Sequence, residues 1–175
     1  PGASPLLQTT MAEWPVLDVA VESVPRERVQ PFWGPDDAYI NLQGGGVSEL
    51  TRKPLTAVLS LPTVPRDTEV LHPFLAGSAA IANLWLERES LHGGAFLFDG
   101  GAWVILGAKE SGKSSTLGWL AARGFPILTD DLVIIDDADR LYSGPRCVDL
   151  REEAARELGV GEPLGLAGAR HRWRH

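Results

Sequence analysis

Eight consecutive residues near the middle of the chain, at positions 107–114, could bind the phosphates of a nucleotide. They match the pattern G-x-x-x-x-G-K-[ST], in which small residues let backbone N–H groups curl around phosphate oxygens. In this pattern Lys113 reaches the β- and γ-phosphates, and the Ser114 hydroxyl ligates a magnesium ion bridging them. We therefore predict that ATP and Mg2+ bind here, against Gly107, Ala108, Lys109, Glu110, Ser111, Gly112, Lys113, Ser114 and Ser115.

Two adjacent acids, Asp130 and Asp131, begin 17 residues after Lys113. One helix and one strand fill that distance, so the acids would lie beside the loop if their strand is next to the strand that enters it. Phosphoryl transfer needs a base for the attacking hydroxyl, and one acid could supply it while the other, Asp130, holds magnesium together with Ser114. A solvated turn is the alternative interpretation of the pair, since aspartate is common in turns.

Glycine positions and apolar runs predict the elements that lead into the loop. Apolar residues at 95–98 and 103–106 flank Asp99-Gly100-Gly101, which predicts a tight hairpin whose second strand runs into the loop. His92 comes just before this hairpin and is a further candidate site residue, although a single histidine is more often structural.

The elements that follow the loop would carry the acids back toward it. A helix is expected over 114–123 with Gly124 at its end, and a strand over 125–129 with the two acids at its carboxyl end. A charged helix is expected over 150–158. Asp149 and Arg151 would lie near the site if the sheet continues through Val148.

Composition excludes several classes of function. The net charge of -7 and the presence of only three lysines argue against a nucleic-acid partner. No apolar run approaches the roughly 18 residues of a membrane helix, so no membrane partner is expected. The single cysteine, Cys147, and the lack of an opening signal peptide favour a cytoplasmic protein.

Taken together, these motifs resemble the catalytic domain of HPr kinase/phosphorylase. The match covers His92-Gly93, the hairpin, the loop, the helix ending in Arg123-Gly124, and the strand ending in Asp130-Asp131. The resemblance implies a fold related to phosphoenolpyruvate carboxykinase and transfer of phosphate from ATP to a serine hydroxyl with magnesium. It also implies that His92 assists catalysis, that the Asp pair activates the hydroxyl, and that the protein is a homo-oligomer.

The chain also departs from the bifunctional enzymes of that family. Ser115 stands where they carry an acidic residue, Lys109-Glu110 replaces an uncharged filling, and their later glutamate for magnesium is not found before His175. These differences weaken the case for phosphorylase activity. The chain is more similar to the shorter HPr-kinase-like proteins, such as those that phosphorylate the last serine of lasso peptide precursors.

We therefore expect an α/β fold of the HPr kinase type with a mixed sheet and a small β-rich N-terminal lobe. The lobe follows from strand-like runs at 16–24, 38–42 and 57–61, and a mostly buried helix is expected over 72–88. Missing sequence is expected at both ends. The expected divisions are a leader or flexible segment at 1–15, the lobe at 16–70, and a kinase-like core at 71–175 that continues beyond the end.

The function expected from the sequence is ATP-dependent phosphorylation of a serine hydroxyl on a peptide or small protein. A small-molecule kinase is one alternative, since such enzymes also place acids after the strand that follows the loop helix. However, about 106 residues precede the loop here, whereas those folds open with it. A catalytically inactive nucleotide-binding regulatory module is the other alternative.

Overall fold

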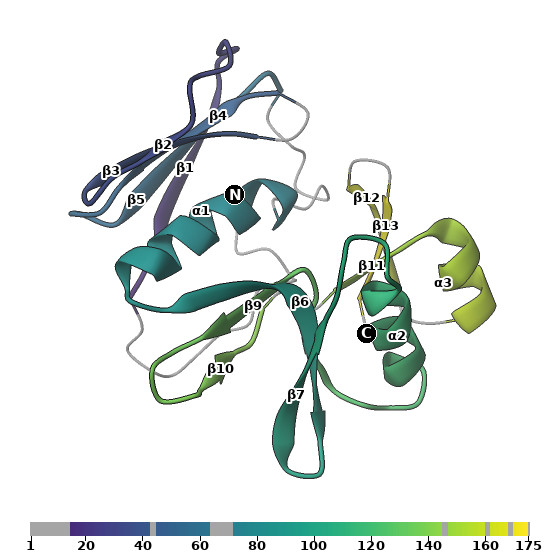
Figure 1. The fold of residues 1–175 in the computed structure, drawn as a ribbon. Helices are drawn as coiled ribbons and strands as arrows, with labels where there is room; N and C mark the ends of the chain where they lie inside the picture. The colour runs from purple at the N-terminus through teal and green to yellow at the C-terminus, as the bar shows by residue number, and fades with distance from the viewer. Residues whose placement is uncertain are drawn as a thin grey trace. The chain divides into compact units, whose positions relative to one another are not determined.

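The computed structural model describes residues 15–42, 45–63, 72–144, 147–159, 162–167 and 170–174. These residues form an α/β fold with three helices and with mixed and antiparallel sheets (Figure 1). Their contacts divide them into an N-terminal unit that ends at Arg88 and a C-terminal unit that begins at Glu89. Within the described ranges, no helix has the length and apolar character needed to cross a lipid bilayer. The expected leader at 1–15 falls outside these ranges except for its last residue.

A five-stranded mixed sheet forms the N-terminal unit, in the order β1-β5-β4-β3-β2. Strand β1 runs parallel to β5, and the other neighbours are antiparallel. This sheet lies in the part of the chain expected to form a β-rich lobe, and residues of β3, β4 and β5 are buried in it. The elements are β1 (Asp18–Ser23), β2 (Phe32–Trp33), β3 (Asp37–Asn41), β4 (Val47–Thr51), β5 (Thr56–Leu61) and α1 (His72–Trp85).

Helix α1 packs on the sheet of the N-terminal unit. Its Trp85 is buried with Ala38, Leu50 and Ala57 of the strands. The hydroxyls of Ser48 and Ser78 hydrogen-bond each other at 2.8 Å across the same interface. Contacts therefore group the helix with the lobe, and the division falls between Arg88 and Glu89 instead of after residue 70.

The C-terminal unit is organised around the long strand β6 (Glu89–Phe98), which pairs with three other strands. All three run antiparallel to it: β7 (Gly101–Leu106), β8 (Ile127–Thr129) and β9 (Leu132–Ile135). Strand β10 (Leu141–Tyr142) pairs with β9. Asp99 and Gly100 form the turn between β6 and β7 with φ of 50° and 75°, which confirms the predicted tight hairpin.

Helix α2 (Lys113–Ala121) follows β7 and fills the core of this unit. Leu117 and Leu120 are buried with Ile127, Val148 and Leu150. The chain leaves the helix through Gly124 at φ 82°, as the sequence predicted. The remaining elements are α3 (Glu152–Leu158) and a three-stranded antiparallel sheet of β11 (Val148–Leu150), β13 (Arg170–Arg174) and β12 (Glu162–Ala167).

Gly94 of β6 lies where helix α2 comes closest to the sheet. A Cβ atom there would overlap Cδ1 of Leu117, and it would also lie 3.3 Å from the carbonyl oxygen of Thr129. Because Leu117 is fully buried, we expect Gly94→Ala to lower the free energy of unfolding by about 1–3 kcal/mol. Urea denaturation should show this loss. Gly101→Ala is the matched control, since its Cβ would meet nothing closer than 3.9 Å; equal stability of the two variants would contradict the packing described.

Candidate nucleotide site

The two sequence motifs meet because β7 and β8 end at neighbouring points on β6. Both strands run antiparallel to β6 and therefore parallel to each other, although β6 lies between them. Leu106, the last residue of β7, is opposite Gly93, and Thr129, the last residue of β8, is opposite Ala95. The loop that follows β7 and the acids that follow β8 thus emerge at the same edge of the sheet.

The residues from 107 to 114, which we call the glycine loop, connect β7 to α2. Residues 107–111 are exposed, so a ligand can reach their backbone. Gly112 precedes the helix with φ 94° and ψ 11°, a left-handed conformation that favours glycine. At Gly107 a Cβ atom would lie 2.6 Å from the hydroxyl of Ser111, which rotation of that exposed side chain can relieve. Gly112 is therefore the glycine of the pattern that the backbone conformation favours.

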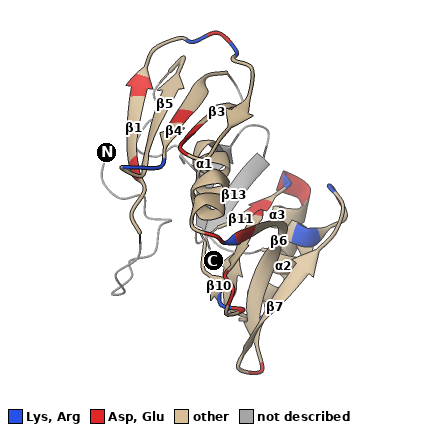
Figure 2. Cartoon of the chain, turned by 60° about the vertical axis from the view of Figure 1, so that its left-hand side comes forward, with Lys and Arg blue, Asp and Glu red and all other residues tan. Residues whose placement is uncertain are grey.

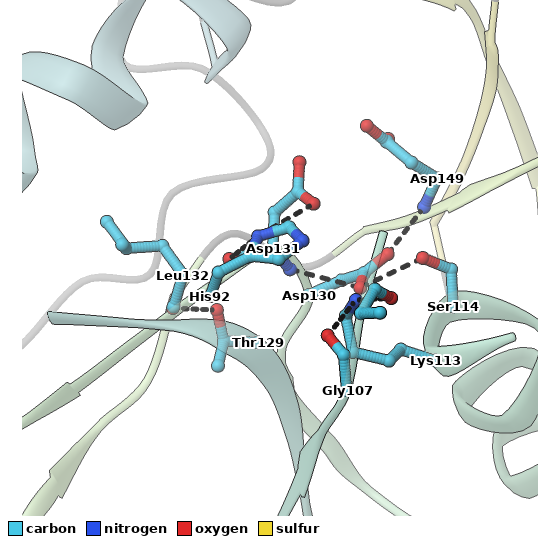
Figure 3. Close-up of polar contacts among 10 residues, drawn as sticks. His92, Gly107, Lys113, Ser114, Thr129, Asp130, Asp131, Leu132 and Asp149 are labelled. Carbon is cyan, nitrogen blue, oxygen red and sulfur yellow. Dashed lines mark hydrogen bonds and ion pairs between the residues drawn. The ribbon is translucent and has the colours of Figure 1, made fainter. Parts of the chain in front are cut away.

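Lys113 folds back over the glycine loop instead of extending into solvent. Its Nζ atom donates hydrogen bonds to the carbonyl oxygens of Gly107 and Ala108, both at 3.0 Å, and the residue is only 8% exposed (Figure 3). The ammonium group is thus held inside the loop at the N-terminal end of α2, where backbone N–H groups and the helix dipole favour an anion. The next residues differ from each other: Ser114 is half-buried and Ser115 is exposed.

Asp130 is the most enclosed acid of the site. It is 5% exposed and accepts hydrogen bonds from the Ser114 hydroxyl at 3.2 Å, from the Asp131 N–H at 3.0 Å and from the Asp149 N–H at 3.0 Å. Figure 3 shows its carboxylate between Ser114 and Asp149. The hydrogen bond from Ser114 joins the acid pair to the glycine loop, which the sequence pattern predicted to lie side by side.

Burial raises the pKa of Asp130 from its usual 3.8 to about 6. The hydrogen bond from Asp149 opposes this increase, the nearby charge of Asp131 adds to it, and the hydrogen bond from Ser114 again opposes it. The ionised form is therefore costly at this position, because the hydrogen bonds that the carboxylate accepts compensate only part of its lost hydration. A bound cation would favour ionisation, so this carboxyl group is suited to respond to a metal.

A pH dependence of stability follows from this shift. The folded-state pKa lies above the unfolded one, so the stabilising contribution is full below pH 3.8 and is lost as pH rises through about 6. We expect the unfolding free energy of the metal-free wild type, relative to Asp130→Asn, to fall by about 2 kcal/mol between pH 4 and pH 7. Urea titrations of both proteins at these two pH values measure it, and parallel pH profiles would contradict the shift.

Asp131 differs from its neighbour because its side chain is accessible. The side chain is 41% exposed, and the backbone has φ 79°, a left-handed conformation that is uncommon outside glycine and asparagine. Its carbonyl oxygen accepts hydrogen bonds from His92 Nδ1 at 3.1 Å and from the Gly93 N–H at 3.3 Å. These contacts hold the turn so that the carboxylate lies 3.9 Å from His92 Nδ1 and points outward. All of the predicted catalytic residues are thus brought to one edge of the C-terminal unit.

Three more residues contribute to the site: Thr129, which was not predicted, and Asp149 and Arg151. Thr129 is fully buried and donates a hydrogen bond from its hydroxyl to the Leu132 carbonyl oxygen at 2.7 Å, which closes the turn around the acids. Nothing in the sequence distinguished this threonine from the rest of its strand. Asp149 and Arg151 also lie at the site, but not because the sheet of β6 continues through Val148: β11 pairs with β13 in a separate sheet. Arg151 forms an ion pair of 2.8 Å with Glu110.

Comparisons of the chain with protein-family models, with curated proteins and with solved structures found no match. We therefore argue its function from the geometry of this site. Among the described residues, no group of three or more histidine, cysteine, aspartate or glutamate side chains could hold a metal ion by itself. A cation here would depend on Ser114, on Asp130 and on oxygen atoms that a ligand brings.

Proposed function

We propose that the C-terminal unit binds a nucleoside triphosphate with magnesium and transfers its γ-phosphate to a hydroxyl group. One observation carries the proposal: Lys113, Ser114 and Asp130 form a connected set at the N-terminal end of α2. Lys113 contacts the glycine loop through two carbonyl oxygens, and Ser114 donates to Asp130 at 3.2 Å. The ammonium group of Lys113 and the carboxyl group of Asp130 are both buried, and charged groups are costly to bury without charged partners, which favours a charged ligand and a metal ion as those partners.

The residues present fit both implied ligands. The exposed backbone of residues 107–111 and the ammonium group of Lys113 offer donors to phosphate oxygens. Ser114 and Asp130 offer oxygen atoms at one side of the helix terminus, and magnesium in nucleotide sites uses one or two protein oxygens together with phosphates and waters. When bound, magnesium would neutralise charge on the phosphate oxygens and favour displacement at phosphorus.

The different exposure of the two acids suggests different roles in phosphate transfer. Asp131, which is accessible, accepts the proton of the acceptor hydroxyl as its oxygen bonds to the γ-phosphorus and the bond to the β-phosphate oxygen breaks. Asp130, which is enclosed, orients Ser114 and the metal. His92 donates from Nδ1 to the Asp131 carbonyl oxygen, which leaves Nε2 of the neutral ring as an acceptor. It holds the turn that aims the base.

The finer assignment extends the resemblance found in the sequence. We propose that this unit has the HPr kinase type of P-loop fold and that the protein is an HPr-kinase-like serine kinase. A peptide or small protein would be its acceptor, and nucleic acid and membranes would not be partners. We further propose a cytoplasmic location and assembly into a homo-oligomer. The connected lysine, serine and aspartate support the phosphotransfer part of this assignment.

Following a labelled phosphate tests the proposal directly. The protein is incubated with magnesium and γ-labelled ATP or GTP, together with serine-containing peptides encoded beside its gene and, separately, with a panel of small hydroxyl metabolites. Label on a peptide serine is the expected result. Label on a metabolite would support the small-molecule kinase instead. Nucleotide binding without transfer to any acceptor would support a regulatory module, and no binding would refute a nucleotide site.

A further inference from the structure

Glu110 puts a negative charge into the loop that we propose binds phosphates. Its backbone has φ 66°, so the residue occupies a left-handed position that glycine would adopt at lower cost. A hydrogen bond of 3.2 Å from the Ser111 N–H to the Ala108 carbonyl oxygen closes the turn around it. The proposed nucleotide function alone gives no reason for a carboxylate here, because like charges repel a triphosphate.

The partner of Glu110 is Arg151, which arrives from a rigid part of the same unit. Its Nη2 atom lies 2.8 Å from Glu110 Oε1, although both side chains remain largely exposed at 69% and 57%. The backbone before it is fixed, since Leu150 is buried against α2 and the Asp149 N–H is bonded to Asp130. A long cationic side chain is therefore anchored beside the glycine loop, while its charged end can still move.

We propose that Arg151 changes partner when nucleotide binds, passing from the carboxylate of Glu110 to the polyphosphate. Glu110 is then a positioning residue that holds the guanidinium at the loop before the ligand arrives. It also limits affinity, because its pair with Arg151 must break and its own charge repels the phosphates. This inference rests on the proposed function and adds a regulator of nucleotide affinity to it.

Exchange of partners predicts how the two charges affect binding. Glu110→Gln removes the competitor and the repulsion, so binding of the magnesium complex of a non-hydrolysable ATP analogue should tighten about three- to tenfold. Glutamine has a similar backbone cost at φ 66°, so this change isolates the charge. Arg151→Gln should weaken binding by about tenfold or more, because a hydrogen bond between two charged groups is lost.

The double variant Glu110→Gln/Arg151→Gln distinguishes partner exchange from independent effects of the two charges on binding. If the pair breaks on binding, the gain from Glu110→Gln is larger in the wild-type background than in the Arg151→Gln background. The difference should equal the strength of the exposed pair, about two- to fivefold in affinity. If the pair survives binding, the two changes are additive. Isothermal titration of wild type, both single variants and the double variant at low ionic strength measures this coupling.

Glu152 and Arg156 provide a matched control on helix α3, where charges of both signs are found (Figure 2). They form an exposed ion pair at 3.0 Å, and their cycle of glutamine variants should leave analogue binding unchanged. Unchanged or weaker binding by Glu110→Gln, or additivity in the Glu110 and Arg151 cycle, would overturn the partner exchange while leaving the nucleotide site intact. A wild type that binds neither ATP nor GTP would overturn both.

Discussion

Lys113→Ala should lower kcat/KM for phosphate transfer by about 10³-fold while leaving the fold intact. The ammonium group is held inside the glycine loop, 3.0 Å from two of its carbonyl oxygens. The ammonium group satisfies the hydrogen-bonding capacity of those two carbonyl oxygens. With a nucleotide bound it would face the β- and γ-phosphates, where charge develops during transfer. Steady-state kinetics with labelled ATP measures the loss.

Lys53→Ala serves as the control for this substitution. Lys53 is exposed in the turn between β4 and β5 of the N-terminal unit, so its removal takes away one positive charge without touching the glycine loop. We expect its turnover to match that of the wild type. If Lys113→Ala retained wild-type kcat/KM and a wild-type melting temperature, the ammonium group would have no part in transfer.

The local parts of this site could be predicted from the sequence. Gly124 and the turn at 99–100 act through the backbone of a few neighbouring residues, and they are found where expected, at the end of the helix and in the tight hairpin. Asp99, Gly100, Gly112 and Gly124 all have positive φ. The glycine loop between a strand and a helix is local in the same way. Such features depend only on interactions between residues close in the chain, and the types and spacing of those residues can be read from a single sequence.

Pairing between distant segments could not be predicted in the same way. The sequence predicted the hairpin that pairs β6 with β7, but it left open whether the strand that leads to the acids would lie next to β7, and the structure puts β6 between β7 and β8. Strand β4, with its polar and apolar residues mixed, was not expected, nor were β12 and β13. Their stability comes from neighbours far along the chain, so local composition says little about them.

The enclosure of Asp130 is another nonlocal result. Its adjacent acid, Asp131, has the same type of side chain but leaves 41% of it exposed, whereas Asp130 is 5% exposed. The difference arises because the backbone N–H of Asp149, 19 residues away, turns toward one carboxylate only. Two identical residues in sequence thereby gain different chemistry, which suggests a direct test of their separate roles.

Asp131→Asn should leave nucleotide affinity within about twofold of the wild type while lowering kcat by about 10²- to 10⁴-fold. The amide cannot accept the proton of the acceptor hydroxyl. The fold should not suffer, because asparagine tolerates φ 79° at least as well as aspartate. The contacts from His92 and Gly93 go to the backbone carbonyl oxygen, which the substitution keeps. Single-turnover transfer and analogue binding, measured side by side, separate the two effects.

Asp130→Asn should show the opposite pattern, with its main effect on nucleotide affinity. Its carboxylate accepts the Ser114 hydroxyl and belongs to the proposed magnesium contact, so its loss should weaken magnesium-dependent nucleotide binding by about tenfold or more. Affinity for nucleotide without magnesium should change little. If instead Asp130→Asn transfers phosphate normally and Asp131→Asn loses magnesium dependence, the enclosed acid is not the metal contact. The roles assigned here would then be reversed, although Asp130 is the enclosed acid with hydrogen bonds from Ser114 and Asp149, and Asp131 is the accessible one.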